Sequence, residues 1–125
     1  MKRMNLISAL CILAAVVLLT AASDGDWLQR VPEKDRMRMN PVSSDKDAIG
    51  AGAKLFQQHC AACHGANAEG KNKHPNLRSD VVQHAQPGEL QWLLTNGSLR
   101  RGMPSWSRLP EEQRWQLVMY LKSLR

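Results

Sequence analysis

The stretch that decides the fold lies near the middle of the chain and reads Cys60-Ala61-Ala62-Cys63-His64. Two cysteines separated by two residues and followed at once by a histidine form the pattern of c-type haem attachment. Thiols three positions apart lie on one face of a helical turn, where both reach the vinyl groups along one haem edge. The histidine then has the position of the proximal iron ligand. The pattern predicts one covalently attached haem c.

Two other kinds of site also use a pair of cysteines at this spacing. A redox-active dithiol is expected in a strand–helix context and makes no use of His64. A structural zinc site needs a second pair of ligands, and the third cysteine of the chain, Cys11, lies alone near the N-terminus. Haem attachment is the favoured interpretation, and a thiol-redox protein without haem is an alternative.

Residues 1–22 differ in composition from the rest of the chain. Lys2 and Arg3 precede an almost unbroken apolar run, and small residues follow it up to Ser23. This pattern predicts a secretory signal peptide. The apolar run also reaches the lower length limit of a membrane span, so an uncleaved leader would anchor the protein. Export predicts a periplasmic protein, which contacts the membrane only if the leader is retained.

The charge of the chain is mildly basic. Its net charge is +6, and two of the positive charges belong to the leader. A basic carrier favours partners with acidic docking surfaces. The basic residues are scattered and export removes the chain from nucleic acid, so no nucleic-acid partner is expected. A chain this short has a thin hydrophobic core, and a bound haem is expected to supply much of what is missing.

Residues 23–45 are expected to form an arm or linker that precedes the main domain at 46–125. The segment carries Trp27 but is interrupted by Pro32 and Pro41, and it shows neither a helical nor a strand period. Two interpretations are open. The segment is either a flexible linker or an extended arm that packs Trp27 onto the domain or onto a partner.

Three helices are predicted after the arm. The first spans residues 44–63, with Ser44 as its N-cap. The other two span residues 89–96 and 110–124, and loops connect all three. Gly52 is either an ordinary surface glycine or the point at which another helix comes close. Residues at spacings of three and four share one face of the first helix, namely Ile49, Gly52, Ala53, Phe56, Cys60 and Cys63.

The second iron ligand is predicted to be Met103. A thioether is neutral and soft, favours ferrous iron, and leaves no open position for a substrate. Gly102 permits a close approach of the backbone, Pro104 stiffens the loop, and Trp106 is placed to cover the haem edge.

Other residues near this loop and in the preceding one are weaker candidates. Arg100 or Arg101 is expected near a haem propionate, and the alternative is a solvated basic patch. His74 and His84 are expected to be surface histidines rather than iron ligands.

Six short motifs occur in order, and together they resemble a small class I (monohaem) cytochrome c. The resemblance covers roughly residues 45–125. It implies an all-α class I cytochrome c fold, with three to four helices around one covalently bound haem and with the N- and C-terminal helices crossed. The motifs are Gly52-x-x-x-Phe56, Cys60-Ala61-Ala62-Cys63-His64-Gly65, Pro75-Asn76-Leu77, Asn96-Gly97, Gly102-Met103-Pro104 and Tyr120-Leu121.

The resemblance also implies specific contacts. Gly52 and Phe56 are expected to pack against the last helix, at Leu117 and Tyr120. The carbonyl of Pro75 is expected to accept the Nδ1 proton of the histidine and so to orient its ring. The family often has glycine before this proline, where this chain has a histidine.

The function implied is one-electron transfer in the periplasm, without turnover of a substrate. The partners expected are redox proteins, namely a periplasmic dehydrogenase, a terminal oxidase or both. The alternative is a haem-based gas or redox sensor, in which Met103 leaves the iron.

Overall fold

The computed structural model describes residues 25–125, so the expected leader lies outside the described residues. The described part is helical, with two isolated β-bridges and no strand. This confirms the expected all-α fold. No helix in residues 25–125 is long and apolar enough to cross a membrane.

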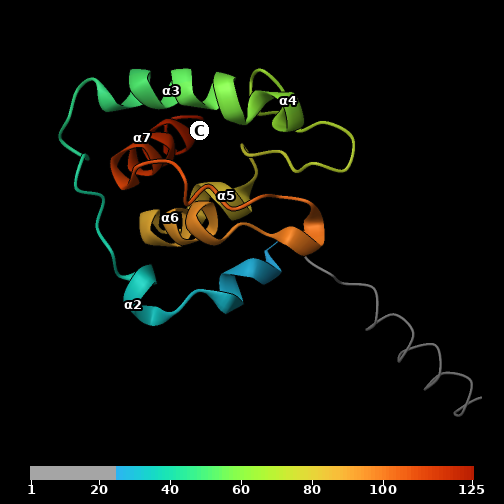
Figure 1. Ribbon diagram of the computed structural model, residues 1–125, viewed down its shortest axis with the longest axis horizontal. Coiled ribbons are helices and arrows are strands. Elements are labelled where there is room, and N and C mark those ends of the chain that lie inside the picture. The colour runs from blue at the N-terminus through green and yellow to red at the C-terminus, as the bar shows by residue number, and fades with distance from the viewer. Residues whose placement is uncertain (1–24) are drawn as a thin grey trace, which may run out of the picture.

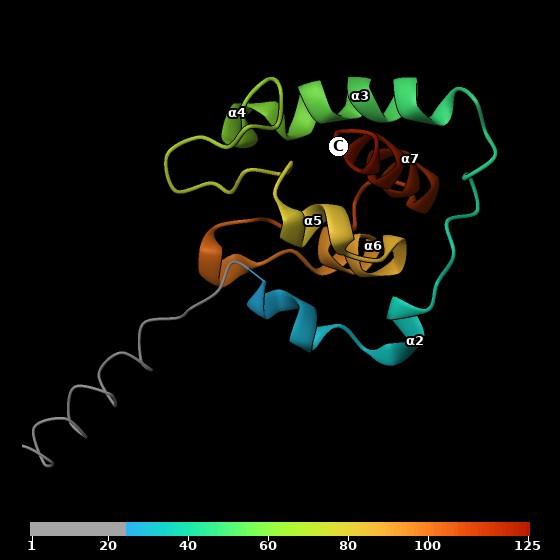
Figure 2. The same ribbon diagram turned by 180° about the vertical axis from the view of Figure 1, so that it is seen from behind.

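The three predicted helices correspond to the three longest ones: α3 (Ala48–His59), α6 (Pro87–Asn96) and α7 (Glu111–Lys122). Figures 1 and 2 show α3 lying across α7, with α6 on the other side of α7. Three shorter helices, α2 (Glu33–Arg36), α4 (Ala61–His64) and α5 (Asp80–His84), and two 3-10 turns, η1 (Asp26–Arg30) and η2 (Leu99–Arg101), complete the described chain. The long helices surround the cavity described below.

Gly52 lies where α3 and α7 cross. A Cβ atom on Gly52 would lie 2.0 Å from the carbonyl oxygen of Gln116 and 2.9 Å from the Cβ of Tyr120. One turn further on, Phe56 is fully buried, and its ring centroid lies 5.2 Å from that of Tyr120. The predicted helix crossing is confirmed, and Gly52 is not an ordinary surface glycine.

Replacing Gly52 with alanine is expected to lower the free energy of unfolding by about 1–3 kcal/mol, because the added methyl group meets backbone atoms that have no room to move. Gly50 is the matched control, since a Cβ there meets nothing within 4 Å. Gly50→Ala should instead stabilise the helix by roughly 0.5–1 kcal/mol. Thermal melts of both variants test this, and a rise in melting temperature for Gly52→Ala would contradict it.

The start of α3 differs from the prediction. The helix begins at Ala48, and Ser44 is not its N-cap. A carboxylate oxygen of Asp45 accepts a hydrogen bond from the backbone N–H of Asp47 at 2.9 Å. This side chain holds the backbone in a turn and so competes with the helix. Ile49, expected on the buried face, is 41% exposed.

Two segments that were predicted to be loops contain short helical turns, α5 and η2. Each is too short for an apolar period to develop, so the pattern did not reveal them. The helix α6 begins two residues earlier than predicted, because Gln86 and Glu89 form a reciprocal capping box. It ends at Gly97, which has φ +69°, as predicted.

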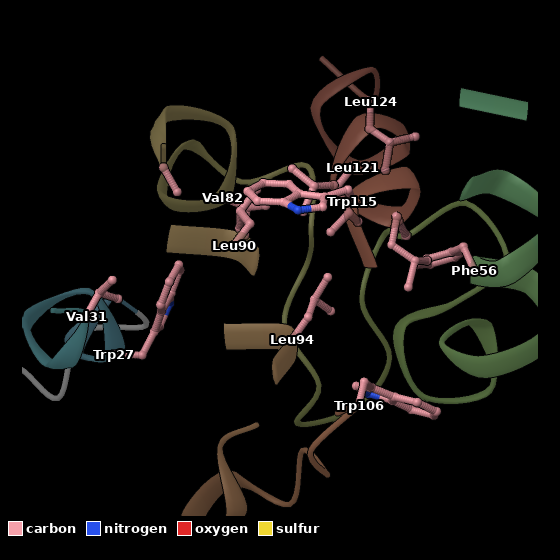
Figure 3. Packing of buried hydrophobic residues seen from close by; sticks show 14 residues of the cluster. Trp27, Val31, Phe56, Val82, Leu90, Leu94, Trp106, Trp115, Leu121 and Leu124 are labelled. Carbon is pink, nitrogen blue, oxygen red and sulfur yellow. The ribbon is translucent and has the colours of Figure 1, made fainter. Parts of the chain in front are cut away.

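The hydrophobic core is a single cluster to which the helices and the arm all contribute. Trp115 and Leu117 of α7 are each only 1% exposed. Figure 3 shows Leu90 and Leu94 of α6 in the same cluster as Trp115. Trp27 belongs to this cluster as well. The arm therefore shares the core of the domain.

The arm, residues 25–45, is folded against the domain, and it contains the helical turns η1 and α2 instead of being extended. Trp27 and Val31 are 6% and 5% exposed. A Cβ on Gly88, at the start of α6, would lie 2.0 Å from the carbonyl oxygen of Asp35, so the two backbones touch. The arm then passes α7, where the Asn40 side chain donates a hydrogen bond to a backbone carbonyl at 3.2 Å. The arm is thus a packed part of the fold.

Replacing Arg36 with alanine is expected to lower the free energy of unfolding by about 1–3 kcal/mol, because it leaves a buried carboxylate without its cation. Arg36 Nη1 lies 2.8 Å from Glu89 Oε1, and the Glu89 side chain is 6% exposed. Lys34→Ala, at an exposed position of α2, is the control and should stay within about 0.5 kcal/mol of wild type. Urea titrations measure both, and equal small effects would show that the ion pair adds no stability.

Candidate haem site

A cavity of about 1000 Å³ lies among α3, α6, α7 and the loops beside them. Its volume is at the upper end of the range for cofactor pockets. The four residues that the sequence predicted to hold the haem and its iron, Cys60, Cys63, His64 and Met103, all line it. Much of the remaining wall is apolar and includes Phe56 and leucines of α6 and α7, which suits a large and mostly apolar cofactor.

The backbone around the two cysteines makes a tight turn between α3 and α4. Cys60 has φ −119° and separates the two helices. Its carbonyl oxygen accepts hydrogen bonds from the N–H groups of Cys63 at 3.1 Å and of His64 at 2.9 Å. The following Gly65 has φ +85°, a conformation that favours glycine and ends α4. Both sulfur atoms and the imidazole are therefore carried by one helical turn.

The state of the two thiols counts against the alternatives to haem. Both are free, and burial, followed by the charge of Cys63, raises the pKa of Cys60 to about 11. Reactive dithiols have lowered pKa values instead. Among residues 25–125, no group of three or more His, Cys, Asp or Glu side chains is placed to hold a metal ion. The raised pKa of Cys60 is thus opposite in direction to that of a redox-active dithiol.

His64 is oriented by the hydrogen bond that the resemblance implied. Its Nδ1 lies 3.1 Å from the carbonyl oxygen of Pro75. Because a carbonyl only accepts, Nδ1 carries the proton and Nε2 keeps its lone pair. Burial lowers the pKa of His64, the bond to Pro75 partly opposes this, and His74 lowers it further. The lowered pKa favours the neutral ring, which is the form in which imidazole binds a metal.

The turn before Pro75 forms although His74 takes the place of the usual glycine. Lys71 and His74 are joined by two backbone hydrogen bonds, of 3.2 and 2.9 Å. The ring centroid of His74 lies 6.1 Å from that of His64, and His74 lines the cavity. His84 is exposed, and its Nδ1 lies 2.9 Å from the carbonyl oxygen of Asp80. Of these two weaker candidates, only His74 has a place in the cavity wall.

Met103 closes a short loop. Its backbone and that of Ser98 exchange two hydrogen bonds, of 2.9 and 3.1 Å. Gly102 has φ +79°, the left-handed conformation that glycine adopts without strain. Trp106 is 8% exposed and lines the same cavity, and its backbone N–H donates to the carbonyl oxygen of Leu94 at 2.8 Å. The side chain predicted to cover the haem edge thus belongs to the cavity wall.

The structure adds residues that the sequence did not assign to the site. Trp27 of the arm lines the cavity, as does His59, whose ring centroid lies 5.2 Å from that of Trp106. The sequence contained one indication that the arm packs onto the domain, namely a tryptophan within a polar segment that prolines interrupt. Arg100 and Arg101 also line the cavity, so a role of either near a haem propionate stays a prediction.

The comparison with protein families agrees with this geometry. The family model described as cytochrome c oxidase, cbb3-type, subunit III, matches residues 47–121. The chain belongs to this family of cytochromes c. Its members carry covalently attached haem c, and they serve as electron carriers. The matched residues include the Cys60–His64 motif and Met103.

Curated relatives within and beyond the family are longer proteins. The chain is 37% identical over 89 residues to the cbb3-type cytochrome c oxidase subunit FixP of Bradyrhizobium sp., covering 67% of this chain and 30% of that protein. It is 30% identical over 119 residues to subunit CcoP of Rhodobacter capsulatus, covering 86% and 38%. It is 33% identical over 91 residues to the quinohemoprotein alcohol dehydrogenase ADH-IIG of Pseudomonas putida, covering 72% and 12%. The chain thus spans less than two fifths of each.

Proposed function

We propose that this cytochrome is a periplasmic one-electron carrier in which His64 and Met103 are the two iron ligands. Cys60 and Cys63 would form the two thioether links to the porphyrin. When bound, haem c supplies a reversible couple of ferric and ferrous iron. The observation that carries the proposal is that both thiols and both candidate ligands line one cavity.

Each residue of the site has a distinct part in this proposal. His64, held by the Pro75 carbonyl, presents Nε2 to the iron. Met103 would be the second ligand of the iron and would leave no open position at which a substrate binds. Trp106 would cover the edge of the cofactor and limit the access of water. Arg101, which lines the cavity, is proposed to lie near a propionate. The chain would thereby supply the same two iron ligands, His64 and Met103, in both oxidation states.

The partners proposed are a dehydrogenase that donates electrons, a terminal oxidase that accepts them, or both. The names of the relatives include one quinohemoprotein dehydrogenase and several subunits of a cbb3-type oxidase. A mildly basic chain suits acidic docking surfaces on such partners. The composition of residues 1–22 supports export, and c-type haem is normally attached outside the cytoplasmic membrane.

The test uses the full chain, produced in a bacterium that exports and matures c-type cytochromes. A haem stain should survive a denaturing gel, a potentiometric titration should follow a one-electron curve, and carbon monoxide should leave the ferrous spectrum unchanged on first mixing. Membranes that contain a cbb3-type oxidase should reoxidise the ferrous protein. A two-electron titration of thiols without a haem stain would instead establish the thiol-redox alternative.

A second candidate function is a sensor in which Met103 leaves the iron when a gas binds or the redox state changes. The observation that favours it is the exposure of residues 99–102, which directly precede Met103. A loop with an exposed side has room to move. Binding of carbon monoxide to the wild-type protein separates the two functions.

A further inference from the structure

The loop that carries Met103, residues 98–103, is held at its base by two backbone hydrogen bonds between Ser98 and Met103, and it is packed closely just after the methionine. There, Pro104 lies against Gly97 so closely that a Cβ on the glycine would be 2.6 Å from the Pro104 carbonyl carbon. Before the methionine, Leu99 is 78% exposed, and the next three residues are exposed as well. This leading side of the loop needs a support of its own if it is to hold Met103 in one place.

The arm lies on that exposed side. Asp26 Oδ1 is 3.3 Å from Arg101 Nη2, and Arg30 Nη2 donates to Ser98 Oγ at 3.4 Å. The two contacts engage the first residue of the loop and the last residue of η2. Figures 1 and 2 both show η1, drawn in blue, beside η2, drawn in orange, although the two are far apart in the sequence.

Between these two contacts the arm enters the wall of the cavity. Trp27 is 6% exposed and lines the same cavity as Met103. Gly25 lies close to α5, since a Cβ on it would be 3.3 Å from Val81 Cγ1, and Val81 also lines the cavity. Trp27 therefore forms part of the cavity wall, while its neighbours Asp26 and Arg30 contact the Met103 loop. The family match begins only at residue 47, so this element is additional to the matched domain.

We propose that residues 25–30 of the arm are an outer clamp on the Met103 loop and set how readily Met103 leaves the iron. Asp26 and Arg30 are positioning residues that hold the loop, and Trp27 fills the space into which the loop would otherwise relax. The inference rests on the proposed function, because it takes Met103 as an iron ligand. The loop has a closed state, in which Met103 is bound to the iron, and an open state, in which it is not. Contacts between the arm and the closed loop lower the free energy of the closed state and so favour the bound methionine.

The experiment measures the rate of carbon monoxide binding to the ferrous, haem-loaded protein, because the gas enters only when Met103 is off the iron. Asp26→Asn should raise this rate about two- to fivefold, which corresponds to the ~0.4–1 kcal/mol of a partly exposed ion pair. Trp27→Ala should raise it further. Both variants should weaken the absorption band that reports sulfur bound to ferric iron.

Asp35→Asn is the matched control, because it makes the same change of charge on α2 of the arm, where the backbone contacts Gly88 and not the loop. Its rate should equal that of wild type. Thermal melts of all variants report folding, and Asp26→Asn keeps the shape of the side chain and should fold. The clamp is refuted if Asp26→Asn and Trp27→Ala both bind carbon monoxide at the wild-type rate, even where their melting temperatures fall.

Failure of the proposed function gives a different result. In that case the wild-type protein would bind carbon monoxide as fast as Met103→Ala, and the sulfur band would be absent from both. That outcome removes Met103 from the iron and overturns the clamp together with the carrier. A slow wild type with arm variants that do not differ from it overturns the clamp alone.

Discussion

Met103→Ala is expected to bind carbon monoxide readily in the ferrous state, whereas the wild-type protein should bind it only slowly, at the rate at which Met103 leaves the iron. Removing the thioether opens the second axial position of the iron, and the site then has the vacancy that a gas or a peroxide needs. His64 and both thioether links remain, so the fold should be retained. Absorption spectra of the reduced protein with and without carbon monoxide measure the effect. Met39→Ala, at a position 87% exposed on the arm, is the control and should leave the spectrum unchanged.

Met103→His refines this test without opening the site. An imidazole donates more strongly than a thioether and favours ferric iron, so the reduction potential should fall while the iron keeps six ligands. The sensor function moves ahead if wild type already binds carbon monoxide readily and Met103→Ala leaves both potential and spectrum alone. His74, which lines the cavity, would then be the next ligand to test.

The double variant Cys60→Ala, Cys63→Ala is expected to lose the haem and most of the cooperative fold. The cavity of about 1000 Å³ lies among α3, α6 and α7, and many of its lining side chains belong to the core cluster. Without a cofactor those side chains lose their packing partners on one side. A chain of this size has a small hydrophobic core, so the remaining contacts are too few to compensate. Haem stain and helical circular dichroism are the two measurements.

Two controls separate the loss of haem from the loss of cysteine. Cys11→Ala removes the third cysteine of the chain, which lies in the apolar run of residues 1–22, and should keep both haem and fold. Cys63→Ala should retain the haem through the single link at Cys60, with a shifted absorption spectrum. A double variant with no haem stain and unchanged circular dichroism would show that the polypeptide folds without its cofactor.

Much of the site could be predicted from the sequence alone, because it depends on residue type and on spacing over a few positions. The spacing of Cys60, Cys63 and His64 is a property of one helical turn, and the chain indeed carries all three on such a turn. Gly97 ends α6 because of a local backbone angle, which a residue type reveals directly. Met103 stood out because a methionine in a polar loop has little reason to fill a core, and it does line the cavity.

Boundaries of helices were predicted less well, because side chains outside the helix decide them. The bond from the Asp47 N–H to the Asp45 carboxylate delays α3 by several residues. For Gly52, the sequence left open an ordinary surface glycine and a helix crossing. The carbonyl oxygen of Gln116, which leaves no room for a side chain at Gly52, shows that it lies at a helix crossing. Contacts such as that between Gly52 and Gln116 join residues that are far apart in the sequence, so a local sequence pattern does not reveal them.

The role of the arm was decided by tertiary structure alone. Residues 25–45 carry no period, so the sequence left a flexible linker and a packed arm equally open. Burial of Trp27 and the ion pair of Asp26 with Arg101 exist only because η1 lies beside η2, while α2 packs against α6. The sequence by itself determined which atoms are available to hold a haem, since that depends on residue type and local spacing. Which segments close around the haem depends on contacts between distant parts of the chain, and the fold alone brings those together.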